Sequence, residues 1–333
     1  SPVFSPDGRW LYFSSDRGGS MNLWRLPVGT DGIPKGDAQP VTTGTQSMGW
    51  AAFSGDGRRM VAMAFDRTNE VSFYELQHLR RGETAPLRRL KLQSATQCTE
   101  SPDAAWISCS TRGAHEDLVL LRSDGSEMRR LTDDEHKDRG ASWTPDGQAL
   151  AFYSTRSGAW NYWWIRTDGS DLRQITAFYD FNGGVLSPDG KQVALNADYR
   201  GLVVVDTNVS KPVDWSTAKT LPLPAGYPEA MFGPAAWSPD GRFIAGFETS
   251  ASGRAASYAI YDLKEKSLRR LELTSGRGAS IAGWLPDSRN LVLRGPAGVV
   301  IYDTVPGTTR TILAEPTCDS LGLARVGEVQ MVQ

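Results

Sequence analysis

The amino-acid sequence predicts an all-β fold built from seven copies of one four-stranded unit. A Ser-Pro-Asp-Gly type of motif recurs through the 333 residues, with its aspartates 43 to 51 residues apart. Short apolar runs flank each copy, and no stretch shows the sustained period of a capped helix. A period in the forties that spans a whole chain indicates a repeat architecture. The motif copies begin at Ser5, Ser54, Ser101, Thr144, Ser187, Ser238 and Leu285.

Each motif has the composition of a tight turn between two strands. Proline presets φ for the second position of a type I turn, aspartate suits the third, and glycine takes the left-handed conformation that follows. In the fourth repeat, Ser142-Trp143 precedes the turn and Ala149–Tyr153 follows it. A third strand at Asn161–Ile165 and a fourth at Leu172–Thr176 complete the unit.

Four short antiparallel strands bounded by Gly, Pro and Asp turns describe one blade of a β-propeller. Seven such units predict a seven-bladed β-propeller over residues 1–314. The tail, residues 315–333, contains two further apolar runs. These runs predict either strands that close the ring or a degenerate eighth repeat, so eight blades with an incomplete last one is the alternative.

The repeats also resemble a known family. The unit Leu131–Thr176 is similar to the repeat of TolB-like β-propellers. The opening Ser1–Pro27 resembles repeats in the sensor part of bacterial serine/threonine kinases and winged-helix regulators. Such propellers serve as interaction modules, peptidase gates and, in some cases, lyases. The resemblance therefore implies a bacterial binding or sensor domain, periplasmic or extracytoplasmic, that is part of a larger polypeptide or assembly.

Composition limits the partners that can be expected. A net charge of −2 provides no overall field for nucleic acid or for an anionic membrane. The chain has no apolar run long enough to span a bilayer, so direct membrane insertion is not expected. Because it begins inside a predicted strand, we expect a trimmed fragment whose targeting information lies elsewhere. The basic residues between Arg80 and Lys91 are interpreted as a solvated hairpin, and nucleic acid is not an expected partner.

Cysteine usage leaves one pairing open. Cys98 precedes the third motif and Cys109 follows it, so the two can lie on adjacent strands of one blade. Two buried thiols that act as small apolar side chains are the expectation, with a disulfide as the alternative. Cys318 has no obvious partner, and three cysteines do not make a disulfide framework.

The two faces of a propeller carry different connections. Turns between strands one and two share one face with those between strands three and four, so the repeated motif turns are expected to be structural. On the opposite face an arginine recurs just after the second strand of several repeats. We expect a partial ring of guanidinium groups that suits carboxylate, phosphate or anionic sugar. The alternative is that each arginine bonds a neighbouring loop or an adjacent acid. These arginines are Arg17, Arg67, Arg112, Arg156 and, less well aligned, Arg200.

The same face carries the candidate acid–base residues. His136 lies in the charged connection Asp133–Gly140, and His115 comes from the preceding repeat. Together with Tyr199 they would move the proton in a propeller-type polysaccharide lyase or hydrolase acting on acidic oligosaccharides, the alternative function. Histidines at metal-ligand spacing are missing from the sequence, so no metal and no other cofactor is predicted. Trp160 and Tyr227 could stack on a sugar or grip a peptide.

The leading hypothesis is a non-catalytic binding or sensor module. The sequence contains no Gly-x-Ser-x-Gly elbow, no His-Glu-x-x-His helix, no phosphate-binding glycine loop and no EF-hand. We therefore lean against an enzyme and expect a protein segment or a small anionic ligand to bind at the channel mouth. The predicted ligand-binding residues are Arg17, Arg67, Arg112, Arg156, Arg200, His136, Trp160 and Tyr227.

Overall fold

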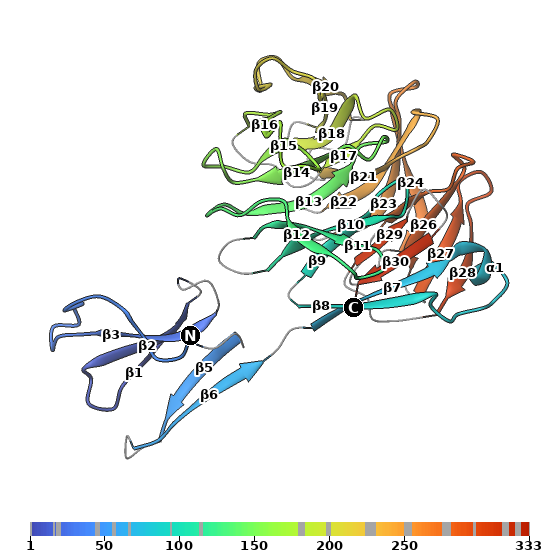
Figure 1. Cartoon of the computed structure of the whole chain (residues 1–333). Helices are drawn as coiled ribbons and strands as arrows, with labels where there is room; N and C mark the ends of the chain where they lie inside the picture. The colour runs from blue at the N-terminus through green and yellow to red at the C-terminus, as the bar shows by residue number, and fades with distance from the viewer. Residues whose placement is uncertain are drawn as a thin grey trace.

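The fold is all-β, as predicted, and within the described residues one short helix, α1 (Leu76–Arg80), interrupts the strands (Figure 1). Seven four-stranded antiparallel sheets and one separate hairpin contain these strands. The computed structural model describes residues 2–15, 17, 21–43, 47–54, 58–65, 68–93, 95–112, 116–178, 184–197, 201–223, 231–249, 255–274, 281–295, 298–314, 320–323 and 328–332.

Six of the sheets follow the chain order of the repeats. The N-terminal sheet consists of β1 (Val3–Phe4), β2 (Trp10–Ser15), β3 (Asn22–Pro27) and β4 (Gln39–Pro40). The next sheets are β9 (Ala95–Glu100), β10 (Trp106–Thr111), β11 (Leu118–Arg122) and β12 (Met128–Arg130); then β13 (Asp138–Trp143), β14 (Ala149–Ser154), β15 (Asn161–Arg166) and β16 (Arg173–Gln174). They continue with β17 (Gly184–Leu186), β18 (Gln192–Ala197), β19 (Gly201–Asp206) and β20 (Lys219–Leu221); β21 (Met231–Trp237), β22 (Phe243–Thr249), β23 (Ala255–Asp262) and β24 (Ser267–Thr274); and β25 (Ile281–Trp284), β26 (Asn290–Gly295), β27 (Gly298–Asp303) and β28 (Thr308–Leu313).

The remaining strands depart from this order. The hairpin β5 (Ser47–Phe53) and β6 (Met60–Phe65) forms a sheet of two strands. The seventh four-stranded sheet combines strands from distant parts of the chain, in the order β29 (Ser320–Leu323), β30 (Glu328–Val332), β7 (Thr68–Glu75) and β8 (Arg88–Gln93).

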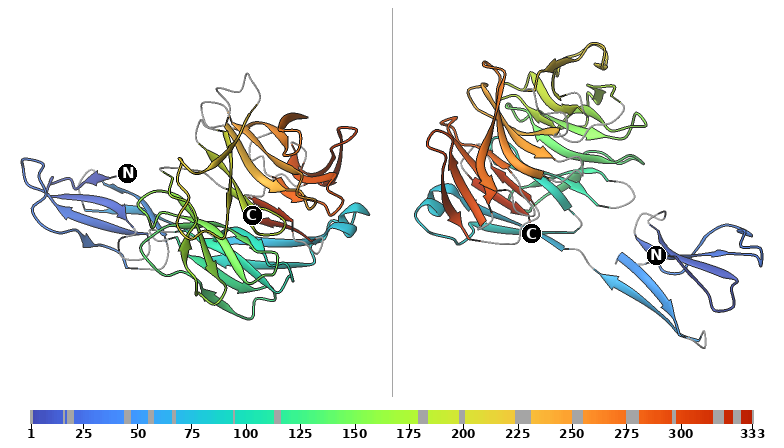
Figure 2. Two further views of the ribbon diagram at one scale, coloured as in Figure 1. Left: turned by 90° about the horizontal axis from the view of Figure 1, so that it is seen from above. Right: turned by 180° about the vertical axis from the view of Figure 1, so that it is seen from behind.

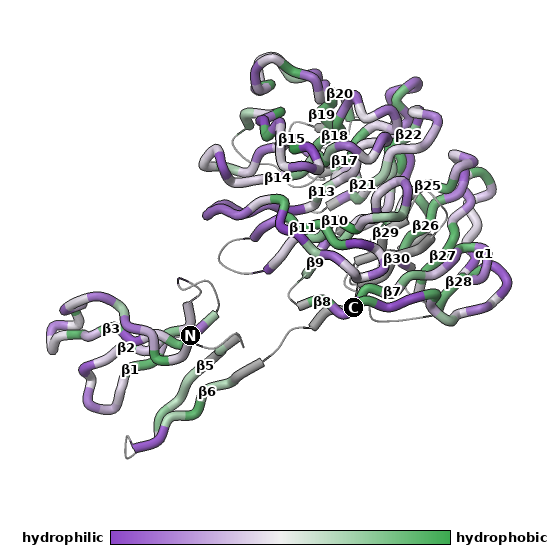
Figure 3. Tube along the Cα trace, in the orientation of Figure 1, coloured by the Kyte–Doolittle hydropathy of each residue, from purple (hydrophilic) through white to green (hydrophobic). Residues whose placement is uncertain are grey.

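Six four-stranded sheets contact one another in a closed circle, and each contact is a separate hydrophobic core (Figure 2). Apolar side chains of adjacent sheets meet in these cores. Many of the turns between the strands are hydrophilic (Figure 3). Burying one large apolar side chain contributes about 2–3 kcal/mol, so these cores dominate the stability of the circle. Representative pairs within the six cores, in circle order, are Phe73 with Ile107, Leu120 with Phe152, Tyr162 with Leu195, Leu202 with Phe232, Tyr258 with Leu293, and Val292 with Tyr74.

The sheet that closes the circle joins the C-terminal hairpin to β7. The strands β30 and β7 pair antiparallel, with Val332 opposite Val71 and Glu328 opposite Glu75. On β7, Phe73 enters the core with the sheet β9–β12, whereas Tyr74 enters the core with the sheet β25–β28. The strand β29 lies against both β9 and β25. The C-terminal hairpin therefore supplies the inner half of the closing sheet.

The sheet β1–β4 and the hairpin β5–β6 lie beside this circle (Figures 1 and 2). The strand β5 packs on β2 and β3, and the ring of Phe53 meets the ring of Tyr12 edge-on at 5.0 Å between centroids. Four-stranded antiparallel sheets are thus confirmed as the building unit. The seven-bladed ring is not confirmed and stays a prediction, as does the division of the chain at residue 314.

The repeated motif is held together by one hydrogen-bond pattern. In the fourth repeat the Thr144 hydroxyl donates to the Asp146 carboxylate at 2.6 Å and accepts the Ala149 N–H at 3.0 Å. The same carboxylate accepts the N–H of Gln148 at 3.0 Å, and Gly147 takes φ +69°. Ser101, Ser187 and Ser238 repeat this arrangement with the aspartates of their own motifs. The pattern explains why a hydroxyl, an aspartate and usually a glycine recur at fixed spacing.

The two central cysteines form a disulfide, so the expectation of two buried thiols is wrong. Cys98 on β9 and Cys109 on β10 are bonded, with their Cα atoms 4.1 Å apart. The pairing register of these strands shifts between Ser108 and Ser110, and Gln97 takes a φ of +50° there. This local bulge places the two cysteines opposite each other, which sequence spacing alone left open.

One ion pair ties the closing sheet to its neighbour, and its removal should destabilise the circle. Arg88 on β8 donates to the Glu100 carboxylate at 2.6 Å, and the Glu100 side chain has 0% exposure. Replacing Arg88 with Leu removes a charged partner of this buried carboxylate, which should lower the free energy of unfolding by about 3 kcal/mol. Urea unfolding measures the change. The double variant Arg88→Leu/Glu100→Leu should recover most of the loss, because no charge stays buried.

The exposed pair Arg81–Glu83 provides the control for this prediction. Its N–O distance is 2.7 Å, but both side chains are more than half exposed. Arg81→Leu should leave the unfolding midpoint unchanged. Equal unfolding midpoints for Arg88→Leu and Arg81→Leu would contradict the assigned role of Arg88.

The motif aspartates should make stability depend on acid pH. Hydrogen bonds from the Thr144 hydroxyl and the Gln148 N–H lower the pKa of Asp146. A lowered folded-state pKa gives stability that is present above the unfolded value and lost as pH falls through the folded value. Asp146→Ala should therefore lower the free energy of unfolding by less than about 1 kcal/mol at pH 7, because the carboxylate is exposed. Near pH 2 the decrease should be smaller still. Thermal unfolding at both pH values tests this, and an equal cost at both would contradict it.

Candidate ligand-binding pocket

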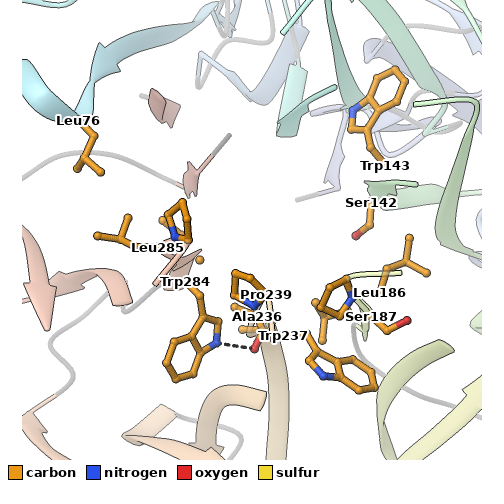
Figure 4. Close-up of a pocket in the computed structure, with 16 residues that line it drawn as sticks. Leu76, Ser142, Trp143, Leu186, Ser187, Ala236, Trp237, Pro239, Trp284 and Leu285 are labelled. Atoms are coloured by element: carbon orange, nitrogen blue, oxygen red, sulfur yellow. Dashed lines mark hydrogen bonds between the residues drawn. The ribbon is translucent and has the colours of Figure 1, made fainter. Parts of the chain in front are cut away.

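A cavity of about 540 Å³ opens where the innermost strands reach the motif turns (Figure 4). Three tryptophans at the ends of β13, β21 and β25 stand at its walls: Trp143, Trp237 and Trp284. Prolines from three copies of the repeated motif complete the wall: Pro188, Pro239 and Pro286. The cavity is therefore built from the repeat itself, with equivalent residues converging from successive sheets.

The tryptophans are fixed by hydrogen bonds from their indole nitrogens. The indole N–H of Trp284 donates to the Ala236 carbonyl at 3.2 Å (Figure 4). The indole N–H of Trp143 donates to the Thr99 carbonyl at 3.0 Å. Both bonds reach back to the preceding sheet of the circle. Trp237 instead donates to Gly241 within its own turn, at 3.1 Å. Each ring is thus held in one orientation, and apolar surface is presented without an unsatisfied donor.

The lining is mostly apolar, with few polar groups. Ala235, Leu186 and Leu285 add to the wall, and Leu76 of α1 lies at one side. Ser187 brings a hydroxyl, but this group already donates to Asp189 and accepts the Gln192 N–H. A concave, apolar and aromatic site of this volume is typical of ligand pockets in proteins. Its chemistry is shape and apolar contact rather than proton transfer.

The opposite end of the strands carries the predicted arginine site, and there Arg156 is committed to internal acids. Its guanidinium donates to Asp134 at 2.7 Å and to Asp138 at 2.5 Å, and the side chain is 7% exposed. Asp138 is fully buried, and burial raises its pKa even though Arg156 and the Ser154 hydroxyl oppose the shift. Arg156 therefore compensates a buried carboxylate, which is the alternative that the sequence left open.

Trp160 also belongs to a packed cluster on this face. The Arg139 guanidinium lies over its ring at 5.0 Å, and the ring of Tyr153 meets it at 5.3 Å. Arg139 is bound in turn by the Glu116 carboxylate through two N–H groups, one of them at 2.6 Å. Burial raises the pKa of Tyr153, whose hydroxyl accepts a hydrogen bond from Gln97 at 3.0 Å. The cluster is half-buried and internally satisfied.

The predicted site residues are only partly brought together. The backbone N–H of His136 donates to the Asp134 carboxylate at 2.9 Å, and Asp134 also binds Arg156, so the His136 loop lies beside that arginine. Arg112 is exposed and its guanidinium is 3.4 Å from the Thr96 hydroxyl. Arg17 follows β2 of the sheet β1–β4, which lies outside the circle, and its side chain donates to the Ser15 hydroxyl. The other candidates fall outside the described residues: Arg67, Arg200, Tyr227, His115 and Tyr199.

Sequence reasoning missed the pocket because it treated the motif turns as structural only. A signal was present, since Trp143, Trp237 and Trp284 each stand directly before a motif copy. In the parts of the chain that the structure describes, no cluster of three or more potential ligands could hold a metal ion. No helix formed by the described residues is long and apolar enough to cross a membrane.

Comparison with curated proteins gives two partial relatives. An uncharacterised protein of Agrobacterium fabrum, Atu1656, is 28% identical over 177 residues, which cover 53% of this chain and 57% of that protein. A dipeptidyl-peptidase 5 of Porphyromonas endodontalis is 33% identical over 88 residues, which cover 26% of this chain and 13% of the peptidase. The match thus spans little more than half of one relative and a small part of the other. No protein-family model matches the chain.

Solved structures similar to the chain are β-propellers of several kinds. One, described as TolB from Agrobacterium tumefaciens, covers all of this chain and 88% of its own length, with 17% identity and a TM-score of 0.40. The Cps50 (Swd1) β-propeller domain of Myceliophteria thermophila covers 99% of this chain and 94% of its own, with 13% identity and a TM-score of 0.48. TolB-type propellers are thus among the structures the chain resembles. At these TM-scores the likeness carries no argument about activity.

The pocket should bind a dye with apolar aromatic rings, and filling the pocket should weaken that binding. The dye 8-anilinonaphthalene-1-sulfonate becomes fluorescent when it enters an apolar cavity. Ala235→Trp places an indole inside the cavity and should weaken dye binding about tenfold. Leu172 is 44% exposed in the parent chain and does not line the pocket, so Leu172→Trp should leave dye binding unchanged. Equal dye binding by both variants and the parent chain would contradict the pocket assignment.

Proposed function

We propose that the chain is a non-catalytic propeller-type binding module that holds a segment of another protein by an apolar side chain. The observation that carries the proposal is the cavity of about 540 Å³ walled by Trp143, Trp237 and Trp284. Rigid aromatic side chains offer large contact area at low entropic cost, and they are enriched where proteins bind one another.

The described charges favour this ligand over a small anion. Arg156 is nearly buried and bonded to two carboxylates, so an incoming anion would have to displace them. Arg139 is likewise held by Glu116. Breaking a buried ion pair to bind one new charge gains little, because the released carboxylates lose their partner. An apolar group that enters the tryptophan pocket displaces only solvent.

The position of the pocket also suits a protein ligand. It lies at the end of the innermost strands, with prolines of three motif turns in its wall. An extended segment could cross this end of the strands and insert one side chain between the prolines of adjacent motifs. A sensor role in an extracytoplasmic compartment is proposed from the family resemblance alone. No described contact favours the lyase or hydrolase alternative.

Peptide selection tests the proposed function. A random-peptide phage library panned on the chain should yield peptides that share a large apolar residue. Their affinities, measured by fluorescence polarisation, should fall about tenfold in Trp237→Ala, because one wall of the pocket is lost. Trp10→Ala, in the sheet β1–β4, is the matched control and should bind like the parent chain. Selected peptides that bind Trp237→Ala and Ala235→Trp as tightly as the parent chain would refute the proposal.

A further inference from the structure

Two hairpins of the chain, β29–β30 and β5–β6, could each pair with the same edge of β7. The hairpin β29–β30 occupies the free edge of β7, with Met331 opposite Ser72. The hairpin β5–β6 is the segment that directly precedes β7, and residues 66 and 67 alone separate Phe65 from Thr68. In the six other four-stranded sheets the second strand pairs with the strand that follows it. Here that pairing is replaced by one with the C-terminus.

A two-residue connection is long enough for β6 to fold back on β7. The strands β26 and β27 are joined by two residues, with Gly295 opposite Gly298. The same geometry would set Phe65 opposite Thr68 and therefore Val61 opposite Ser72. Consecutive residues in a strand face opposite sides of the sheet, so the register decides which residues share a face.

On one face of the sheet this register sets apolar residues of the two strands opposite each other, and on the other face it sets Val61 opposite Ser72 and Met63 opposite Glu70. It sets Ala62 opposite Val71 and Met60 opposite Phe73, on the face of β7 that is fully buried in a core. As the structure stands, β6 is a poorly covered strand, with Val61 73% exposed and Met63 51% exposed (Figure 3). A solvent-exposed apolar strand with an open edge favours acquiring a partner.

The sheet β1–β4 is already placed for the same rearrangement. It packs on β5, as consecutive sheets of the circle pack through their inner strands. If β5–β6 joined β7 and β8, the strands β1–β28 would form seven consecutive four-stranded sheets. That arrangement is the ring that the seven sequence repeats predict. β7 pairs with β8 on one edge and has only one other edge, which β30 takes in the structure, so the two closures exclude each other.

We propose that the hairpins β5–β6 and β29–β30 exchange on the edge of β7. In one state the C-terminal hairpin closes a circle of six sheets and the sheet β1–β4 stands outside. In the other, β5–β6 takes the edge, the ring contains seven sheets, and β29–β30 is released. The exchange is a conformational device separate from the proposed binding function, although it changes the number of inner strands around the channel.

Cysteine trapping in the full chain tests the exchange, in a Cys318→Ser background. The pair Val61→Cys/Ser72→Cys should crosslink slowly with oxidised glutathione, as shown by mass spectrometry of tryptic peptides. Adding Gln330→Pro and Met331→Pro should speed this crosslink about tenfold, because proline removes ladder hydrogen bonds that hold β30. The backbone N–H groups of consecutive residues in a strand point alternately to the two neighbouring strands. One of the two prolines therefore removes an N–H that points to β7.

Two control pairs make the result decisive. Ser72→Cys/Met331→Cys reports the closure seen in the structure and should crosslink readily in the chain without prolines. Met60→Cys/Ser72→Cys places the cysteines on opposite faces in the proposed register and should stay unlinked. The proposal is overturned if Val61 and Ser72 never crosslink within one chain, with or without the prolines, or if they link only between two chains. Should the proline variant not fold, the parent chain alone decides.

Discussion

The pairing of β30 with β7 is the constraint on which the rest of the structure depends. It joins the C-terminus to the second repeat and completes a sheet that contributes to two hydrophobic cores. Without the inner strands of that sheet, β9 and β25 would each lose the neighbour that β29 provides. A circle of sheets gains its full burial only when closed, so this one pairing also supports the four contacts that the closing sheet does not make itself.

Local features of the fold could be predicted because their chemistry is local. The hydroxyl of Thr144, the carboxylate of Asp146 and φ of Gly147 specify a turn within four residues, and the flanking alternation specifies its strands. Closure could not be predicted, because β5–β6 and β29–β30 both present an apolar hairpin that fits β7. Which one pairs depends on contacts between residues more than 200 positions apart, and no local pattern records them.

The candidate site shows the same division. The tryptophans before the motifs are visible in the sequence, but their convergence on one cavity becomes evident only when the sheets are arranged in a circle. Arg156 follows β14, at the end of that strand away from the motif turn. Whether the Arg156 guanidinium can bind a ligand depends on Asp138, because the fold buries that carboxylate within hydrogen-bond distance of it. The repeat period indicates on which face a side chain lies. It does not indicate which groups of the protein already bind that side chain.

Hydrogen exchange of the backbone amides, followed by mass spectrometry of the unmodified chain, tests the central claim most directly. If β30 closes the circle, amides of β7 and β30 should be protected to a degree approaching the strands of the sheet β13–β16, and β6 should exchange much faster. Protection of β6 together with rapid exchange in β30 would contradict closure by the C-terminal hairpin. The six-sheet circle would then not be the main state of this chain.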